Sequence, residues 1–304
     1  MLEFTKLELK HVPLLKPYFD QQDRRINDCT MGSTLMWRDY FDNCFAIEND
    51  TLVFRVRYLE GQYAFTVPIG KDPDGMLALV EEYCQANGIV PEFCTVPPRQ
   101  LPLLQKRWPG LVAEDNRDWY DYLYDSQAMV AFAGRKYAHQ RNHIHRFERD
   151  NPNWSFSRMT AADGEEVRSF YQSFLQEQSK EDDTFQAEAE KIFEVLEHFD
   201  EYGFLGGILR VDGKIVGISM GEVVRDTLYI HVEKALVTYS GVYQKLVNCF
   251  AKEYVTDGVL YINREEDMGD PGLRQSKQSY QPIQLLEKYT VHVCPEKEKT
   301  EGPA

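Results

Sequence analysis

A short stretch in the second half of the chain places a histidine and a carboxylate two residues apart. His231 and Glu233 lie in a run that is expected to form a β-strand, where alternate side chains point to the same face. Acylation of an amine requires removal of a proton from an ammonium, and a partly buried carboxylate beside a histidine can accept it. Glu233, assisted by His231, is therefore the candidate catalytic base. A half-buried salt bridge from Glu233 to an arginine or lysine is the alternative.

Charged side chains follow directly after the next apolar strand, which is expected over residues 259–263. Their density, mixed sign and position at the end of a strand predict a site for a substrate carboxylate or ammonium. The alternative is a network of charges that holds the turn at residues 268–272. The residues assigned to substrate binding are Asn263, Arg264, Glu265 and Lys277.

A basic segment, GRKYAHQRNHIHRFER at residues 134–149, contrasts with the rest of an acidic chain. Its apolar residues recur at helical spacing, so it is expected to be a helix that leaves cations on its other faces. Lys136 and Arg141 are the candidates for binding phosphates of an RNA acceptor end or of a nucleotide, and a solvated face is the alternative. His139 and His143 have the spacing of metal ligands on a helix, but no third ligand is adjacent, so no metal site is expected.

The elements that must position these residues recur in two halves of the chain. In the second half, a strand and two amphipathic helices precede a three-stranded meander, a helix and a buried strand. The turn and helix-end signals of this half are Asp212-Gly213, Arg225-Asp226 and Gly258. The matching signals of the first half lie 163, 165 and 170 residues earlier, at Asn49-Asp50, Glu60-Gly61 and Gly88.

Four segments are expected from this pattern. They are an N-terminal domain over residues 1–133, a basic linker helix over 134–150, a C-terminal domain over 151–293 and a disordered tail over 294–304.

The totals of the chain favour a soluble protein of the cytoplasm. Its 304 residues carry a formal net charge of −15, which argues against general nucleic-acid binding over the whole surface. Charges interrupt the first residues, and no run approaches the roughly 18 apolar residues of a membrane span, so neither a leader nor a transmembrane segment is expected. The six cysteines have spacings that suit neither a zinc site nor a disulfide framework, as is usual in a reducing compartment.

Three strings of the sequence are similar to a known family. GRKYAHQRNHIHRF, HVEKA and YINREEDMGDPGLRQSKQSYQPIQLLEKY resemble the bacterial family named for the C-terminal domain of phosphatidylglycerol lysyltransferase, over residues 31–289. The resemblance implies an α+β fold of two GNAT-like (acyl-CoA N-acyltransferase-like) domains in tandem, each a mixed, mostly antiparallel sheet flanked by helices. It also implies a relation to enzymes that move an aminoacyl group from transfer RNA to a lipid or peptide amine.

The GNAT resemblance adds two groups of site residues. In that fold, the loop after the fourth strand presents N–H groups at a helix N-terminus to the pyrophosphate of coenzyme A. The corresponding residues are Ser240, Gly241 and Val242, of which Gly241 alone matches the usual spacing, and an ordinary tight turn is the alternative. Tyr280 lies where related transferases often place a tyrosine that protonates the leaving group. Core packing is the alternative for Tyr280.

The sequence thus predicts an acyl- or aminoacyltransferase that works by direct attack, without a covalent enzyme intermediate. The donor is expected to be acyl-CoA or aminoacyl-tRNA, the acceptor an amine or a hydroxyl, and no tightly bound cofactor is expected. The other class of function is a non-catalytic module that binds a nucleotide or an acyl ligand on a degenerate GNAT fold.

Overall fold

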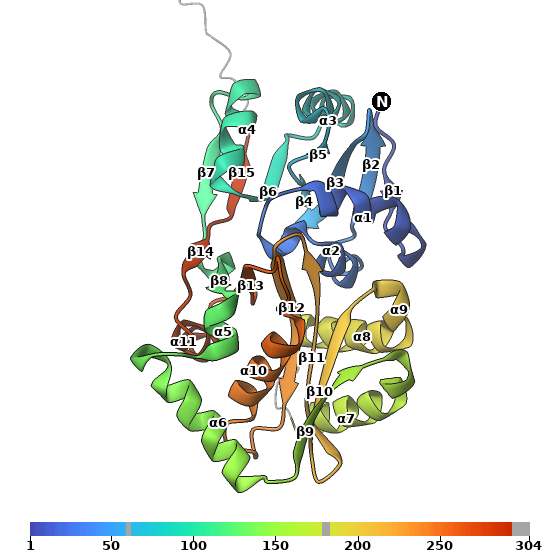
Figure 1. Ribbon diagram of the computed structural model, residues 1–304. Coiled ribbons are helices and arrows are strands. Elements are labelled where there is room, and N and C mark those ends of the chain that lie inside the picture. The colour runs from blue at the N-terminus through green and yellow to red at the C-terminus, as the bar shows by residue number, and fades with distance from the viewer. Residues whose placement is uncertain (59–61, 178–182, 294–304) are drawn as a thin grey trace, which may run out of the picture. The chain divides into compact units, whose positions relative to one another are not determined.

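The computed structural model describes residues 1–58, 62–177 and 183–293. Within these residues, α-helices surround two mixed β-sheets (Figure 1). The chain divides into two compact units, each built around one sheet. Unit 1 consists of Met1–Leu7, Phe41–Arg117 and the segment that begins at Glu287, and unit 2 consists of Glu8–Tyr40 and Asp118–Leu286.

The sheet of unit 1 has the strand order β1-β2-β3-β4-β6-β15-β7, and β5 pairs with β3. β4 and β6 run parallel, and the other neighbouring pairs are antiparallel. The strands are β1 (Thr5–Lys6), β2 (Cys44–Glu48), β3 (Thr51–Tyr58), β4 (Gln62–Phe65), β5 (Ile69–Gly70), β6 (Glu92–Val96), β7 (Val112–Asp115) and β15 (Tyr289–His292). The helices of this unit are α3 (Pro73–Asn87) and α4 (Leu101–Arg107).

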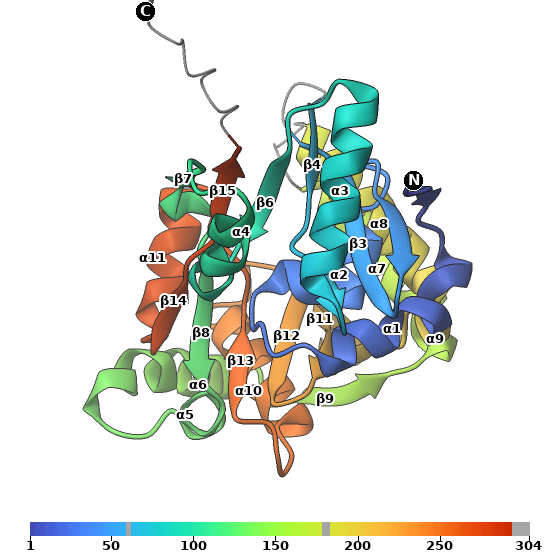
Figure 2. The same ribbon diagram turned by 90° about the horizontal axis from the view of Figure 1, so that it is seen from above.

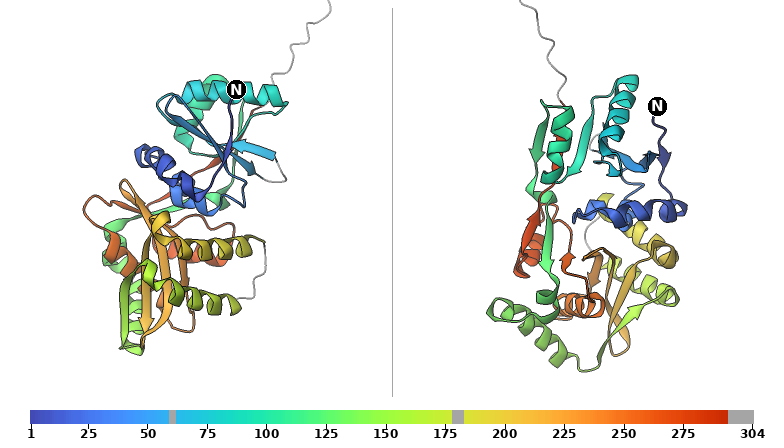
Figure 3. Two further views of the ribbon diagram at one scale, coloured as in Figure 1. Left: turned by 90° about the vertical axis from the view of Figure 1, so that its right-hand side faces the viewer. Right: turned by 45° about the horizontal axis from the view of Figure 1, so that its top comes forward.

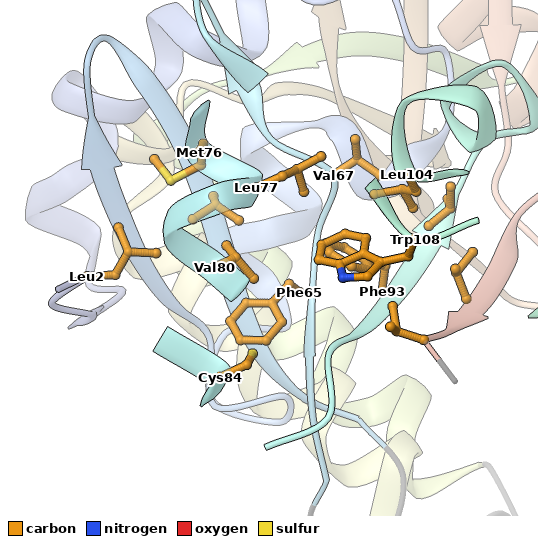
Figure 4. Close-up of a cluster of buried hydrophobic side chains, with 14 of the residues drawn as sticks. Leu2, Phe65, Val67, Met76, Leu77, Val80, Cys84, Phe93, Leu104 and Trp108 are labelled. Carbon is orange, nitrogen blue, oxygen red and sulfur yellow. The ribbon is translucent and has the colours of Figure 1, made fainter. Parts of the chain in front are cut away.

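Helix α3 packs on this sheet through one apolar face (Figure 2). The Asp72 carboxylate caps its first turn by accepting from the Gly75 N–H at 2.9 Å, and Gly88 ends it in the left-handed conformation at φ 66°. The buried face has the i, i+4 spacing of an amphipathic helix. Figure 4 shows Met76, Leu77 and Val80 of this helix in one apolar cluster with Phe93 of β6 and Trp108, which follows α4.

The sheet of unit 2 has the strand order β14-β8-β13-β12-β11-β10-β9, in which β12 and β13 run parallel. Its strands are β8 (Asp121–Asp125), β9 (Trp154–Met159), β10 (Leu205–Val211), β11 (Lys214–Val224), β12 (Thr227–Ala235), β13 (Tyr261–Asn263) and β14 (Gln284–Leu286). The helices are α1 (Val12–Gln21), α2 (Met31–Met36), α5 (Ser126–Ala131), α6 (Ala138–Asp150), α7 (Gly164–Gln176), α8 (Asp183–Glu197), α9 (Phe199–Tyr202), α10 (Val242–Tyr254) and α11 (Pro271–Ser279). Helices α7 and α8 lie side by side on one face of the sheet, and α10 packs with α5 and α6 on the other (Figure 3).

The hairpin turns occur at the predicted positions. Asp212 and Gly213, between β10 and β11, have φ values of 49° and 78°, as a type I′ turn requires. Asn49 and Asp50, between β2 and β3, have φ values of 48° and 53° for the same reason. The predicted turn at 60–61 lies outside the described residues.

The predicted end of α10 at Gly258 was wrong. The helix ends at Tyr254, because Val255 already has φ −79° and ψ 94°, outside the helical region. Gly258 instead has φ 97° in the loop that leads to β13. The predicted end of α3 at Gly88 is confirmed.

The compact units depart from the boundaries expected at residues 133 and 150. Helix α6, expected to be a linker, lies within unit 2 and packs against α10. Strand β8 from the first half of the chain joins the sheet of unit 2 between β13 and β14, and β15 joins that of unit 1 between β6 and β7. Periodicity and turn signals are local, so they do not reveal which sheet a strand joins. The tail expected over 294–304 lies outside the described residues.

Two further features bear on the sequence expectations. The five cysteines within the described residues are buried free thiols, and burial raises the pKa of Cys84 to about 11. No helix among the described residues combines the length and apolar character that crossing a bilayer demands.

Candidate functional site

Strand β12 is irregular at the residues that the sequence nominates as catalytic. Val232 pairs with Met220 of β11 and Ile230 pairs with Gly221, so His231 is the extra residue of a β-bulge. The two-residue alternation between His231 and Glu233 is therefore interrupted. Each of the two side chains has partners of its own.

Glu233 forms a buried ion pair with Arg264, which directly follows β13. Nε and Nη2 of Arg264 donate to Oε2 of Glu233 at 3.0 and 2.6 Å, and the side chains of Arg264 and Glu233 are 7% and 14% exposed. The guanidinium carbon lies 4.5 Å from the centre of the Tyr280 ring. Burial opposes the charge of Arg264, but Glu233 outweighs it and raises the pKa of the guanidinium, which stays cationic. The salt-bridge alternative for Glu233 is thus present.

Three polar atoms around this ion pair have no hydrogen-bond partner within the described chain. They are Oε1 of Glu233, Nη1 of Arg264 and Oγ of Ser219. Ser219 lies opposite Glu233 in the register of β11 and β12. A buried polar atom without a partner is unfavourable unless a ligand or a water supplies one.

His231 lies between two carboxylates in unit 2. Its Nδ1 is 2.9 Å from Oε1 of Glu265 and its Nε2 is 3.1 Å from Oε1 of Glu222, which also accepts from the Gly32 N–H at 2.8 Å. Burial opposes the imidazolium, but the two carboxylates outweigh it and raise the pKa of His231 to about 9. An imidazole that keeps its proton at neutral pH has no lone pair for a substrate proton. This geometry does not support His231 as a base.

Tyr280 lies in the apolar cluster beneath α10. It is 1% exposed, and its ring centre is 5.9 Å from that of Phe132. Burial raises the pKa of Tyr280 to about 12, so its hydroxyl keeps its proton at neutral pH and can donate it but not accept one. Core packing and the role of an acid are both compatible with this position.

Three of the four residues assigned to substrate binding hold other parts of unit 2. Asn263 donates through Nδ2 to the Arg25 carbonyl at 2.7 Å and to Oδ2 of Asp121 at 2.8 Å. Nζ of Lys277 donates to the carbonyls of Arg264, at 2.5 Å, and Glu266. Glu265 is held by His231. Arg264 alone keeps an unpartnered donor, so the structure brings Glu233, Arg264 and Tyr280 together and leaves the other three as supports.

The turn after β13 is held by charges, as the alternative interpretation of this segment predicts. Arg274 of α11 donates to both carboxylate oxygens of Asp267, at 2.9 and 2.6 Å, and to Asp118 at 2.6 Å. The Tyr122 hydroxyl donates to Oδ2 of Asp267 at 2.6 Å. Burial raises the pKa of Asp267, but the hydrogen bonds from these donors outweigh burial. The pKa of Asp267 therefore lies well below its usual range.

The loop before α10 is shaped by the helix next to it. Gly241 has φ 83°, and a Cβ placed there would lie 2.2 Å from the main-chain carbonyl oxygen of His143 in α6. Val242 is 2% exposed, and Ser240 precedes the glycine at partial burial. A side chain at 241 is therefore excluded by packing, and the acceptor that faces this position is a carbonyl. Both features match the ordinary-turn alternative.

The two basic residues assigned to phosphate binding differ in their surroundings. Lys136 is exposed, with Nζ 5.0 Å from the centre of the Tyr137 ring. Arg141 donates through Nη1 to the carbonyls of Phe132 and, at 2.7 Å, Gly134, so it closes the segment that connects α5 to α6. The apolar residues that recur at helical spacing in this segment are buried, namely Tyr137 just before α6 and Ile144 and Phe147 within it.

His139 and His143 approach each other on α6, with 3.1 Å between their Nε2 atoms. In the part of the chain that the structure describes, no group of three or more histidine, cysteine or acidic side chains has an arrangement that could hold a metal ion.

Sequence reasoning missed Ser219, Glu222 and Tyr124. Ser219 and Glu222 interrupt the apolar strand KIVGISMGEVV, and a buried strand that carries two polar residues is a usable signal. Tyr124 lies in β8, with the guanidinium of Arg264 5.9 Å from its ring centre. No local pattern links β8 to the site, because the two are 140 residues apart in the sequence.

Comparison with known proteins gives one family and several solved structures. Residues 19–292 match the family model described as phosphatidylglycerol lysyltransferase, C-terminal. A conserved protein of unknown function from Bacteroides thetaiotaomicron is 28% identical, with a TM-score of 0.89 over 97% of this chain and 100% of that chain. The C-terminal domain of a putative lysylphosphatidylglycerol synthetase from Agrobacterium fabrum is 15% identical, with a TM-score of 0.69 over 94% of this chain and 92% of that one. FemX is 8% identical, with a TM-score of 0.62 over 96% and 97% of the two chains.

A curated relative matches over a shorter length. An uncharacterized protein from Mycoplasmoides gallisepticum is 22% identical over 176 residues, which are 57% of this chain and 56% of the relative. The chain thus spans about half the length of the curated relative that it matches. The structural likenesses confirm the expected fold class, an α+β fold with two mixed sheets flanked by helices.

Proposed function

Because the chain belongs to the family of phosphatidylglycerol lysyltransferase C-terminal domains, we propose that it is an aminoacyltransferase that moves an aminoacyl group to an amine or a hydroxyl. The observation that carries this proposal is the buried Arg264, whose Nη1 has no partner within the described chain and whose charge is held by Glu233. Acyl transfer develops negative charge on the carbonyl oxygen of the donor. A fixed cationic N–H in buried surroundings stabilises that charge strongly.

The remaining residues fit the proton movements of the same reaction. The nitrogen or oxygen of the acceptor forms a bond to the acyl carbon, the bond from that carbon to the donor breaks, and the proton of the acceptor ends on the leaving group. A tyrosine hydroxyl is protonated at neutral pH and burial raises the pKa of Tyr280 further, to about 12, so Tyr280 can donate a hydrogen bond to the leaving oxygen. Glu233 has one oxygen, Oε1, available to a donor on the substrate.

We favour aminoacyl-tRNA over acyl-CoA as the donor. Gly241 of the loop faces the main-chain carbonyl oxygen of His143, and a carbonyl oxygen repels phosphate. The exposed cations of the neighbouring segment, Lys136 among them, suit the phosphates of an RNA acceptor end. A transfer RNA donor also places the reaction in the cytoplasm, in agreement with the location expected from the sequence.

The function is tested by offering the same protein both donors. Radiolabelled aminoacyl-tRNA, charged with a mixture of amino acids, and radiolabelled acetyl-CoA are each incubated with vesicles that contain phosphatidylglycerol or with a lysine-containing peptide. We expect label to move from aminoacyl-tRNA to one acceptor, and not from acetyl-CoA. Transfer from acetyl-CoA alone would mean that acyl-CoA is the donor and aminoacyl-tRNA is not. Transfer from neither donor would contradict the proposal.

Arg264→Lys is the variant that tests the observation on which the proposal rests. Lysine keeps the positive charge but loses the planar fork that holds Glu233 and directs Nη1, so we expect turnover to fall about 100-fold or more. Arg38→Lys is the matched control, because Arg38 forms a comparable buried pair with Glu194 at 2.6 Å. Equal turnover in the two variants would mean that Arg264 takes no part in the reaction.

The second candidate function is a binding module without catalysis. It is favoured by the number of charged side chains around the site that are engaged within the protein, since His231 and Glu265 bond to each other and Lys277 bonds to main-chain carbonyls. A module of this kind would bind aminoacyl-tRNA or a nucleotide at equilibrium without releasing the acyl group. Filter binding in parallel with the transfer assay separates the two functions.

A further inference from the structure

The ion pair of Glu233 and Arg264 lies at the centre of a group of unpartnered polar atoms. Oε1 of Glu233, Nη1 of Arg264 and Oγ of Ser219 are buried and have no partner among the described residues. Ser219 is the residue directly opposite Glu233 on β11, so their side chains are neighbours. Arg264 reaches the same carboxylate from the end of β13. Buried polar atoms are nearly always hydrogen-bonded, so three around one ion pair indicate where a ligand makes the missing bonds.

The types of these atoms restrict the chemistry of that ligand. A guanidinium N–H only donates, a carboxylate oxygen only accepts, and a hydroxyl does either. Oε1 of Glu233 therefore needs a donor and Nη1 of Arg264 needs an acceptor, so a ligand group that carries a donor next to an acceptor oxygen satisfies both atoms. An α-amino group beside a carbonyl has this arrangement.

We propose that Glu233 and Arg264 are specificity-determining residues that recognise the free α-amino group and the carbonyl of the transferred acyl group, an inference that rests on the proposed function. Oε1 of Glu233 accepts a hydrogen bond from the α-ammonium, and Nη1 of Arg264 donates to the carbonyl oxygen. Ser219 supplies a hydroxyl beside them. As the carbonyl oxygen becomes anionic during transfer, the ligand becomes a zwitterion whose two charges face the opposite charges of the ion pair. An acyl group with a blocked or absent amine leaves Oε1 without a donor.

This role for Glu233 differs from that of a base in what a variant would change. A base acts on the acceptor, so its loss would slow the transfer of every acyl group by a similar factor. A residue that recognises the α-ammonium separates acyl groups that carry a free amine from those that do not. The difference is measurable by binding alone, without turnover.

The test uses three small amides that share a carbonyl and differ in the amine. Alaninamide has a free α-amine, N-acetylalaninamide has a blocked one, and propionamide has none. Their dissociation constants for the full chain are measured by titration followed by protein NMR. We expect alaninamide to bind at least about 10-fold more tightly than the other two, the range of a hydrogen bond between charged groups. In Glu233→Gln, which keeps the shape of the side chain and its contact with Arg264, the preference should fall to within about 2-fold.

The matched control is Glu194→Gln, which makes the same change in the pair between Glu194 and Arg38 and should keep the wild-type preference. Equal binding of the three amides would mean that water satisfies these atoms, and an undetectable affinity for alaninamide or an intact preference in Glu233→Gln would equally overturn the assignment. The result is independent of the transfer assay. A clear preference without transfer would contradict the proposed function alone, and transfer without a preference would contradict this inference alone.

Discussion

The α-carbon of Gly241 faces the main-chain carbonyl oxygen of His143 so closely that a Cβ would lie 2.2 Å from that oxygen. Gly241→Ala should therefore be more destabilising than a glycine replacement at positive φ alone. The φ of 83° contributes about 1 kcal/mol, and the steric overlap about 1–3 kcal/mol more. Gly213→Ala is the control, since Gly213 has φ 78° and no atom within 4 Å of the added Cβ. Urea unfolding of both variants measures the difference, and equal losses would mean that α6 does not press on this loop.

The two cations assigned to phosphate binding should separate into one structural and one binding residue. Arg141 donates to the carbonyls of Phe132 and Gly134, so Arg141→Ala should reduce the free energy of unfolding by about 1 kcal/mol or more. Lys136 is exposed, so Lys136→Ala should change the free energy of unfolding by less than about 0.5 kcal/mol. The sequence alone does not distinguish these two cations, and the hydrogen bonds of Arg141 do.

Lys136→Ala should act on RNA binding instead. If Lys136 contacts a phosphate, the slope of log affinity for aminoacyl-tRNA against log salt should fall by about one. Affinities measured at several salt concentrations test this. An unchanged slope would leave Lys136 as a solvated residue.

The sequence predicts the elements of this fold wherever one local requirement decides them. A two-residue hairpin turn needs two successive left-handed conformations, which few residue types other than Asn, Asp and Gly accept. Asp212-Gly213 and Asn49-Asp50 supply such residues, and hairpins form at both places. The family strings also lead to Arg264 and Tyr280. What local signals lack is the partner of each element. The bulge at His231 depends on the register with β11, and the end of α10 depends on a conformation at Val255 that no helix-stop residue marks.

The same limit applies to the candidate site. The sequence contains Glu233 and Arg264 as separate charges, and only the parallel pairing of β12 with β13 brings them within 2.6 Å. Asn263, Glu265 and Lys277 have the residue types of a binding site but are engaged with Arg25, His231 and main-chain carbonyls. A charge of a given type is compatible with catalysis or with support, and the hydrogen-bond partners decide between the two.

The position of the last strand gives a further prediction. Val291 of β15 is fully buried in the core of unit 1, between β6 and β7, although the sequence assigns residue 291 to the C-terminal domain. Val291→Ala should lower the free energy of unfolding by about 1–3 kcal/mol, through lost apolar burial and the cavity left behind. Val112→Ala on the neighbouring strand β7 is the control, since Val112 is 54% exposed and should change stability by less than about 0.5 kcal/mol. Similar values for the two variants would contradict this placement of β15.

The buried His231 makes the stability of unit 2 depend on pH in a defined window. Its pKa is raised from 6.5 to about 9 by Glu222 and Glu265 against the opposing effect of burial, so the folded state binds the proton more tightly than the unfolded state. The resulting stabilisation is fully present below pH 6.5 and is lost as the pH rises through about 9. It amounts to a few kcal/mol, on the order of 3, over this window. Hydrogen bonding to His231 lowers the pKa of Glu222 despite its burial, so Glu222 stays ionised throughout.

His231→Gln keeps a side chain that can bond to both carboxylates but cannot carry the charge. We expect this variant to be less stable than the wild type at pH 6.5, with a difference that narrows towards pH 9.5 as the wild type loses its proton. His145→Gln, at an exposed histidine, is the control. In this variant the free energy of unfolding should change with pH as it does in the wild type. Free energies of unfolding from urea titrations at pH 6.5, 8 and 9.5 give the three curves. Parallel curves for the wild type and His231→Gln would show that His231 is not charged in the folded protein, and a neutral imidazole would restore His231 as a candidate base.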